Sequence, residues 1–117
     1  MALPLPPTVV QGTITANGQA VEAGCASAVG LGIQVTGTWT GTLTFQGSVD
    51  GVTWTTFGTT TNGLNPWPGT TGVATTTANG MWTAPAATIA GLVFVQVVAT
   101  ATITGTATVT INLTKAA

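Results

Sequence analysis

Charged side chains are almost absent from this chain of 117 residues. Only Glu22, Asp50 and Lys115 carry a formal charge, and the chain has no histidine. Because nucleic-acid affinity comes from several Lys or Arg contacts to phosphates, one lysine argues against a nucleic-acid partner. Two acids and no histidine also leave almost nothing for acid–base catalysis or for a metal site. We therefore expect no enzyme, no cofactor and no bound metal.

Cysteine and long apolar segments are equally scarce. Cys25 is single, so an internal disulfide is excluded, and without a histidine to activate it we expect a small buried hydrophobe. The N-terminus has no basic region followed by a long apolar core, so it does not have the form of a conventional signal peptide. The most apolar segment, residues 90–103, is too short and too rich in threonine to span a bilayer. We therefore expect no membrane partner.

Threonine, at about a quarter of all residues, takes the place of charge. Its β-branched side chain favours strands and supplies a polar surface that stays neutral. A single folded copy has little charge to keep it apart from its neighbours. This composition favours large neutral contact surfaces in a permanent assembly. The alternative is a monomer kept in solution by threonine or by attached glycans.

Alternation of apolar and polar residues predicts β-strands. In residues 38–46, Leu43 and Phe45 alternate with hydroxyl and amide side chains, which is the period of a half-buried strand. The dipeptide Asp50-Gly51 then predicts a two-residue hairpin turn into a strand over 52–57.

Further turn signals divide the rest of the chain into short strands. Asn17-Gly18 predicts a hairpin between strands at 13–15 and 19–22, and Gly105 predicts another between Ile103 and Thr106. Other expected strands cover residues 31–35, 73–77, 81–83, 92–100 and 106–113. Short strands at this spacing, without a helical period, predict an all-β fold, an antiparallel β-sandwich of Ig-like or jelly-roll-like form with about seven or eight strands.

Two segments outside these strands are candidates for contact surfaces. Residues 1–11 carry three prolines and predict an extended arm, followed by a β-sandwich domain over 12–117. Residues 58–72 predict a long loop without periodicity, and long loops in small domains often carry function.

Several blocks of the chain resemble, in order, a small β-sandwich domain family of bacteriophage virion proteins. The blocks are residues 15–21, 35–48, 50–54, 77–82 and 94–111. The resemblance implies a structural role in the particle, as a capsid decoration protein, a head fibre or a tail module, without a catalytic motif. Relatives often have arginines on the strand that matches 94–100, where this chain has Gln96 and Val98. The departure fits a strand that a partner covers.

This resemblance leads us to expect a capsid decoration (cement) protein on the outer surface of the phage head, made in the host cytoplasm as a complete small protein. Its partners would be the lattice of the major capsid protein and other copies of itself, with a trimer fitting the quasi-three-fold positions of a shell. Each copy would stabilise the shell by binding the assembled form better than its dissociated subunits. The candidate interface residues are Leu3, Leu5, Leu64, Trp67, Phe94 and Val98.

Two other functions remain open. The first is a tail, baseplate or fibre protein of the same fold. The second is a carbohydrate-binding β-sandwich module, in which tryptophans stack on sugar rings. Trp39 and Trp54 lie in hydrophobic strand patterns and are expected in the core. Trp67 lies between two prolines in the long loop, with Asn62 and Asn65 as nearby amides, and is the better candidate for a sugar. The sequence leaves open whether Trp67 and Trp82 are exposed.

Overall fold

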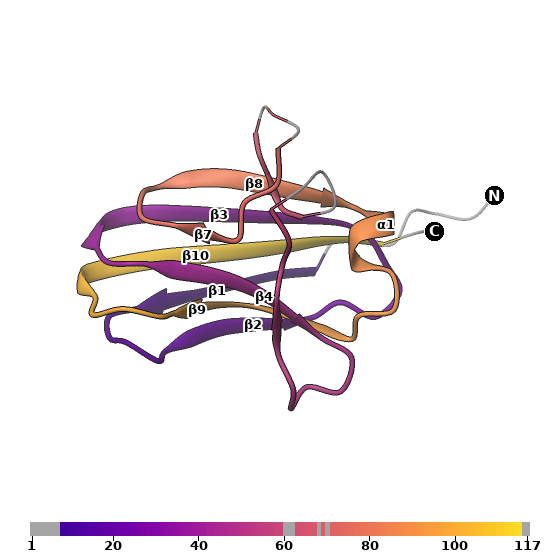
Figure 1. Cartoon of the computed structure of the whole chain (residues 1–117), viewed down its shortest axis with the longest axis horizontal. Helices are drawn as coiled ribbons and strands as arrows, with labels where there is room; N and C mark the ends of the chain where they lie inside the picture. The colour runs from indigo at the N-terminus through magenta and orange to yellow at the C-terminus, as the bar shows by residue number, and fades with distance from the viewer. Residues whose placement is uncertain (1–7, 60–62, 68, 70, 116–117) are drawn as a thin grey trace.

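The computed structural model describes residues 8–59, 63–67, 69 and 71–115. Two antiparallel sheets pack face to face along the long axis of the molecule (Figure 1). Sheet A contains, in spatial order, β1 (Thr8–Ile14), β10 (Thr104–Lys115), β3 (Ala28–Thr40), β8 (Gly80–Pro85) and β6 (Asn65–Pro66). Sheet B contains β2 (Ala20–Gly24), β9 (Phe94–Ala99), β4 (Leu43–Ser48) and β5 (Thr55–Thr56), and β7 (Thr75–Thr76) also pairs with β4.

The predicted all-β sandwich is therefore confirmed. The described residues form ten strands, of which β5, β6 and β7 have two residues each. The strand predicted over 73–77 is reduced to the two residues of β7. A single-turn helix, α1 (Ala86–Ile89), follows β8 at one end of the sandwich (Figure 1).

The core lies between the two sheets and is built from the alternate, inward residues of each strand. Phe45 of β4 is fully buried, and its ring centroid lies 5.1 Å from that of Trp82 on β8, with the ring planes tilted by 52°. Such a tilted pair adds attraction beyond the apolar area that it buries. Cys25 is buried, as expected, and burial raises the pKa of its thiol.

The predicted hairpin at Asn17-Gly18 is wrong in its pairing. Gly18 does adopt a positive φ of 88°, but β1 pairs with β10 in sheet A, whereas β2 pairs with β9 in sheet B. The turn therefore passes the chain from one sheet to the other. The dipeptide Asn17-Gly18 predicts that the chain reverses direction. It does not predict which strands β1 and β2 pair with, because long-range packing decides that.

The chain also changes sheet at Gly41, inside the segment predicted as one strand over 38–46. Gly41 has a φ of +133°, and a Cβ there would lie 2.8 Å from the carbonyl oxygen of Thr102. Residues 38–40 complete β3 in sheet A, and β4 begins at Leu43 in sheet B. Gly105 is likewise no hairpin turn, because it lies within β10 opposite Trp39.

The predicted tight turn at Asp50-Gly51 is a wider loop. Gly51 has the expected positive φ of 79°, but β4 ends at Ser48 and β5 begins only at Thr55. The Asp50 carboxylate accepts hydrogen bonds from the backbone N–H groups of Val52 and Thr53, both at 2.8 Å. These bonds close the loop without a continuous strand ladder, so the strand predicted over 52–57 is reduced to two residues.

The predicted arm over residues 1–11 is wrong for its last four residues. Residues 8–11 belong to β1, which pairs along its length with β10. Residues 1–7 lie outside the described part of the chain.

Candidate contact surfaces

The candidate interface residues do not form one surface. Leu3 and Leu5 lie outside the described residues. The structure corrects the prediction that Leu64 lies at an interface. Leu64 is fully buried in the core, and its backbone forms an isolated β-bridge with Val73. The core between the sheets takes up this loop leucine, so it is not available to a partner.

The remaining three candidates lie on opposite sheets. Trp67 is 63% exposed and follows β6 at the edge of sheet A. Phe94 and Val98 are half-buried and lie on β9 in sheet B, with Gln96 between them. The two sheets therefore offer two separate surfaces.

The outer face of sheet A carries two rows of side chains that the strand register brings together. The first row runs through Trp67, Met81, Gln34, Thr110 and Gln11. The second row runs through Asn65, Thr83, Gly32, Asn112 and Val9. Residues directly opposite each other on neighbouring strands share a face of the sheet. We name these two rows the amide face.

Trp67 joins the amide face through a backbone hydrogen bond. Its N–H donates to the carbonyl oxygen of Met81 at 2.9 Å, which continues the ladder between β6 and β8 by one residue. Met81 itself is 41% exposed. The exposed indole and the thioether thus begin a row that continues with amides and hydroxyls.

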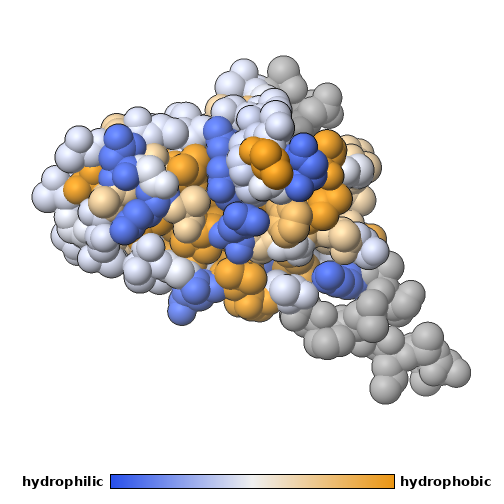
Figure 2. Space-filling model, turned by 90° about the horizontal axis from the view of Figure 1, so that it is seen from below, coloured by the Kyte–Doolittle hydropathy of each residue, from blue (hydrophilic) through white to orange (hydrophobic). Residues whose placement is uncertain are grey.

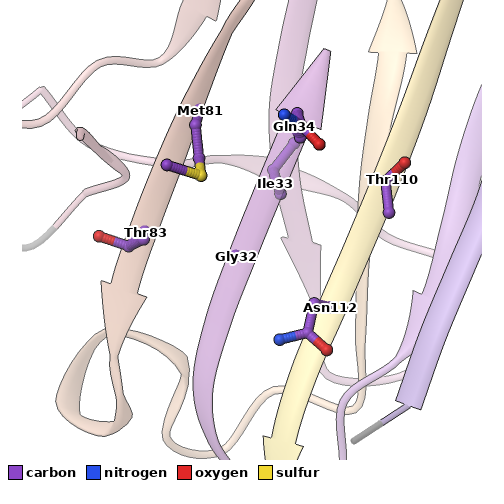
Figure 3. Close-up of a pocket in the computed structure, with 7 residues that line it drawn as sticks. All are labelled: Gly32, Ile33, Gln34, Met81, Thr83, Thr110 and Asn112. Atoms are coloured by element: carbon purple, nitrogen blue, oxygen red, sulfur yellow. The ribbon is translucent and has the colours of Figure 1, made fainter. Parts of the chain in front are cut away.

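The centre of the amide face is a hollow of about 270 Å³. It is lined by Gly32, Ile33, Gln34, Met81, Thr83, Thr110 and Asn112 (Figure 3). Gly32 leaves the hollow open, since a Cβ at this position would meet no atom within 4 Å. Figure 3 shows Met81 and Thr83 on one side of Gly32, and Asn112 extending from β10 toward β3 on the other.

Several polar groups of the hollow are free to bind a ligand. Gln11 Nε2 donates to Thr110 Oγ1 at 3.0 Å, so this pair is already satisfied in part. Within the described part of the chain, the side chains of Gln34, Thr83 and Asn112 make no hydrogen bond. None of the three charged residues of the chain belongs to the two rows.

The outer face of sheet B is different, because its amides bind each other. Gln96 Nε2 donates to Gln46 Oε1 at 2.7 Å, and Gln46 Nε2 reaches Thr56 Oγ1 at 3.4 Å. Glu22 lies opposite Gln96 on the edge strand β2. Gln96 is buried, so this ladder fixes the sheet and leaves little for a ligand.

An apolar rim closes one end of sheet B. It consists of Val49 and Val52 of the β4–β5 loop, which are 66% and 81% exposed, together with Val93 and Phe94 at the start of β9. The N–H of Val93 donates to the carbonyl oxygen of Ser48 at 2.9 Å, which joins the loop to β9. We name this group the valine rim. Figure 2, which views the molecule from below, shows hydrophobic residues at the surface in separate patches between pale and blue ones.

Sequence reasoning missed the valine rim because residues 52–57 were expected to be a strand. The available signal was a pair of valines flanking Asp50-Gly51, since turns are usually polar.

The carboxylate of Asp50 accepts hydrogen bonds from Thr53, Val52 and Ser48, which lower the pKa of this group.

The four tryptophans have different environments. Trp82 is buried, and Trp39 is half-buried with its Nε1–H donating to Asn79 Oδ1 at 2.7 Å. Trp54 is also half-buried. Trp67 is thus the tryptophan whose indole is mainly exposed.

Two further features, a cluster of metal ligands and a membrane-spanning helix, are absent from the part of the chain that the structure describes. No group of three or more potential metal ligands occurs among these residues. No helix among them is both long and apolar enough to cross a membrane.

Comparison with known proteins identifies solved structures of similar fold. No family model matches this chain, and no curated protein matches it by sequence. The crystal structure of the SPBc2 prophage-derived protein YomS is similar, with a TM-score of 0.72 and 17% identity over 97% of this chain and 98% of that chain. The PBSX exported protein XepA has a TM-score of 0.69 and 15% identity, over 92% of this chain and 38% of that chain.

A more distant likeness is to IMPa from Pseudomonas aeruginosa in complex with an O-glycopeptide. Its TM-score is 0.46 at 14% identity, and the match covers 13% of that chain, which is too remote for an inference. At 15 to 17% identity, the likeness to YomS and XepA shows a shared fold.

Proposed function

We propose that this chain is a non-enzymatic structural protein of a bacteriophage particle, bound in many copies to the outside of the head as a decoration protein. The observation that carries the proposal is the match of its fold to a prophage-derived protein over nearly the whole of both chains. The virion-like sequence blocks point the same way. A neutral surface and a core built between two sheets suit a protein that binds a lattice.

The valine rim is the surface that we assign to the shell. Exposed apolar groups that lie together commonly mark protein contacts. Val49 and Val52 project from a loop that its own hydrogen bonds hold in shape, so little order is lost on binding. Phe94, one of the residues expected at the interface, belongs to this rim. Each bound copy then stabilises the assembled shell by mass action.

The first test is the position of the protein on the particle. Gold-labelled antibody on purified particles should label the heads evenly. Label confined to tails or tail tips would overturn the decoration role and support the tail, baseplate or fibre alternative. That alternative has one structural observation in its favour, because in XepA the matching region is 38% of a longer chain.

The second test addresses the rim. Heads that lack the protein should bind the wild type and lose affinity for the double variant Val49→Ser/Val52→Ser. Removing this apolar burial costs about 2–3 kcal/mol, which is about 30- to 150-fold in the affinity of one copy. Val9→Ser is the matched control, since Val9 is 58% exposed but lies on sheet A. Equal binding by the double variant and the control would show that the rim is not the contact.

A further inference from the structure

We propose that the amide face of sheet A, with Trp67 at its edge, binds a neutral oligosaccharide. The inference does not depend on the decoration role, because it rests on the chemistry of a different surface. The valine rim belongs to sheet B and the amide face to sheet A, with the core between them. A copy held through the rim therefore keeps the amide face free.

The first argument is the environment of Trp67. A sugar ring has an apolar face of C–H groups, and a flat aromatic ring with an accessible face can stack on it. Trp67 is 63% exposed, while Trp82 is buried against Phe45 and the Nε1–H of Trp39 is bonded to Asn79. Of these three tryptophans, Trp67 therefore offers the most accessible indole surface on which a sugar could stack.

The second argument is the supply of hydrogen-bonding groups across the amide face, where Gln34 lies two strands and Asn112 three strands away from Trp67. The amides of Gln34 and Asn112 each offer donors and an acceptor, and the hydroxyl of Thr83 offers both roles. Sugar hydroxyls also donate and accept, so they match these groups one by one. The open space above Gly32 lets a ring approach the sheet closely.

The third argument is charge. The two rows of the amide face contain no acidic or basic side chain. An acidic glycan would meet no cation here, and a cationic ligand would meet no anion. The face therefore selects uncharged sugars.

The dimensions set the length of the ligand. Neighbouring strands lie about 4.8 Å apart, so the three steps from Trp67 on β6 to Thr110 on β10 span about 14 Å. A ligand that contacts both ends of this row must therefore be a short oligosaccharide and not a single sugar. The hollow of about 270 Å³ holds one of its sugar units.

The experiment is a glycan array of neutral and acidic oligosaccharides, followed by titration of the best neutral ligand with Trp fluorescence as the readout. We expect binding of neutral glycans with Kd between about 10 µM and 10 mM. Trp67→Ala and Gly32→Val should each weaken binding by about tenfold or more. Trp67→Ala removes the tryptophan expected to report binding and leaves three others, so binding by this variant is measured by calorimetry.

Gly32→Val is the sharper variant, because its side chain fills the hollow without meeting another atom within 4 Å of its Cβ. Gly30→Val is its matched control, since Gly30 lies on the same strand and face but outside the hollow. Both variants should melt at the temperature of the wild type, which separates lost binding from lost folding. Acidic glycans alone on the array, no neutral ligand at all, or equal loss in both glycine variants would each overturn the proposal.

The experiment must also distinguish a sugar on the amide face from a protein partner on the same face. If Gly32→Val abolishes binding to heads or self-association while no sugar binds, the amide face is a protein interface and the sugar proposal is wrong. If Gly32→Val loses sugar binding and still binds heads, the result supports the sugar proposal. The gold-label result bears only on the decoration role, so the two proposals fail separately.

Discussion

Replacing Phe45 by alanine tests the packing of the two sheets most directly. Phe45 is fully buried, and its ring lies 5.1 Å from that of Trp82, so the core depends on it from both sheets. Removing a buried phenylalanine costs about 4 kcal/mol, which includes the cavity that it leaves. Since domains of this size are stable by only about 5–15 kcal/mol, the variant should lose between about a quarter and four-fifths of its free energy of unfolding.

This loss of stability also predicts a shift in melting temperature. Unfolding 117 residues carries an entropy of about 0.25 kcal/mol per kelvin, so a loss of 4 kcal/mol lowers Tm by about 16 °C. Thermal unfolding followed by near-UV circular dichroism measures this shift. Phe94→Ala is the control, because Phe94 is half-buried on the outer side of sheet B and should lower Tm by less than about 6 °C. Equal shifts in the two variants would refute the assignment of Phe45 to the centre of the core.

Three further predictions concern the loop, the crossover and the thiol. Hydrogen bonds lower the pKa of Asp50 below its ordinary value of 3.8, so its contribution to stability is present above that pH and is lost as the pH falls through the lowered pKa. The denaturant midpoint of the wild type should therefore be lower at about pH 2 than near neutral pH, and Asp50→Asn should make this difference smaller. A difference that is unchanged in Asp50→Asn would contradict this role of the carboxylate. Gly41→Ala should cost about 1–3 kcal/mol in urea unfolding, because of its positive φ and the nearby Thr102 carbonyl, whereas Gly32→Ala should cost less than about 1 kcal/mol. Cys25 should react with a thiol reagent only on unfolding, because it is buried and its pKa is raised; rapid labelling of the native protein would place it at the surface.

The positions of the main strands could be predicted from the sequence because alternation is a local property. The run over 92–100 contains β9, and the run over 106–113 lies within β10. Leu43 and Phe45 point into the core, as their period of two indicates. The near absence of charge likewise determined, before any fold was known, that the surface is neutral.

The partners of those strands were beyond sequence reasoning. Gly18 was predicted to lie in a hairpin turn and Gly41 within a single strand, but at both glycines the chain passes from one sheet to the other. A glycine makes a reversal possible and says nothing about which distant strand receives the freed hydrogen bonds. Leu64 shows the same limit for a loop, since its burial depends on the gap that the two sheets leave.

The amide face illustrates what only the tertiary structure decided. The sequence named Trp67 as a candidate contact residue but left its exposure open, and the structure shows that it is 63% exposed. Its neighbours Met81, Gln34 and Thr110 come from three other strands, and they align only through the register of four paired strands. A shift of one residue in any pair would turn those side chains toward the core. Composition and alternation thus determined a neutral β-sandwich, whereas register, which long-range packing sets, determined the surfaces that it presents.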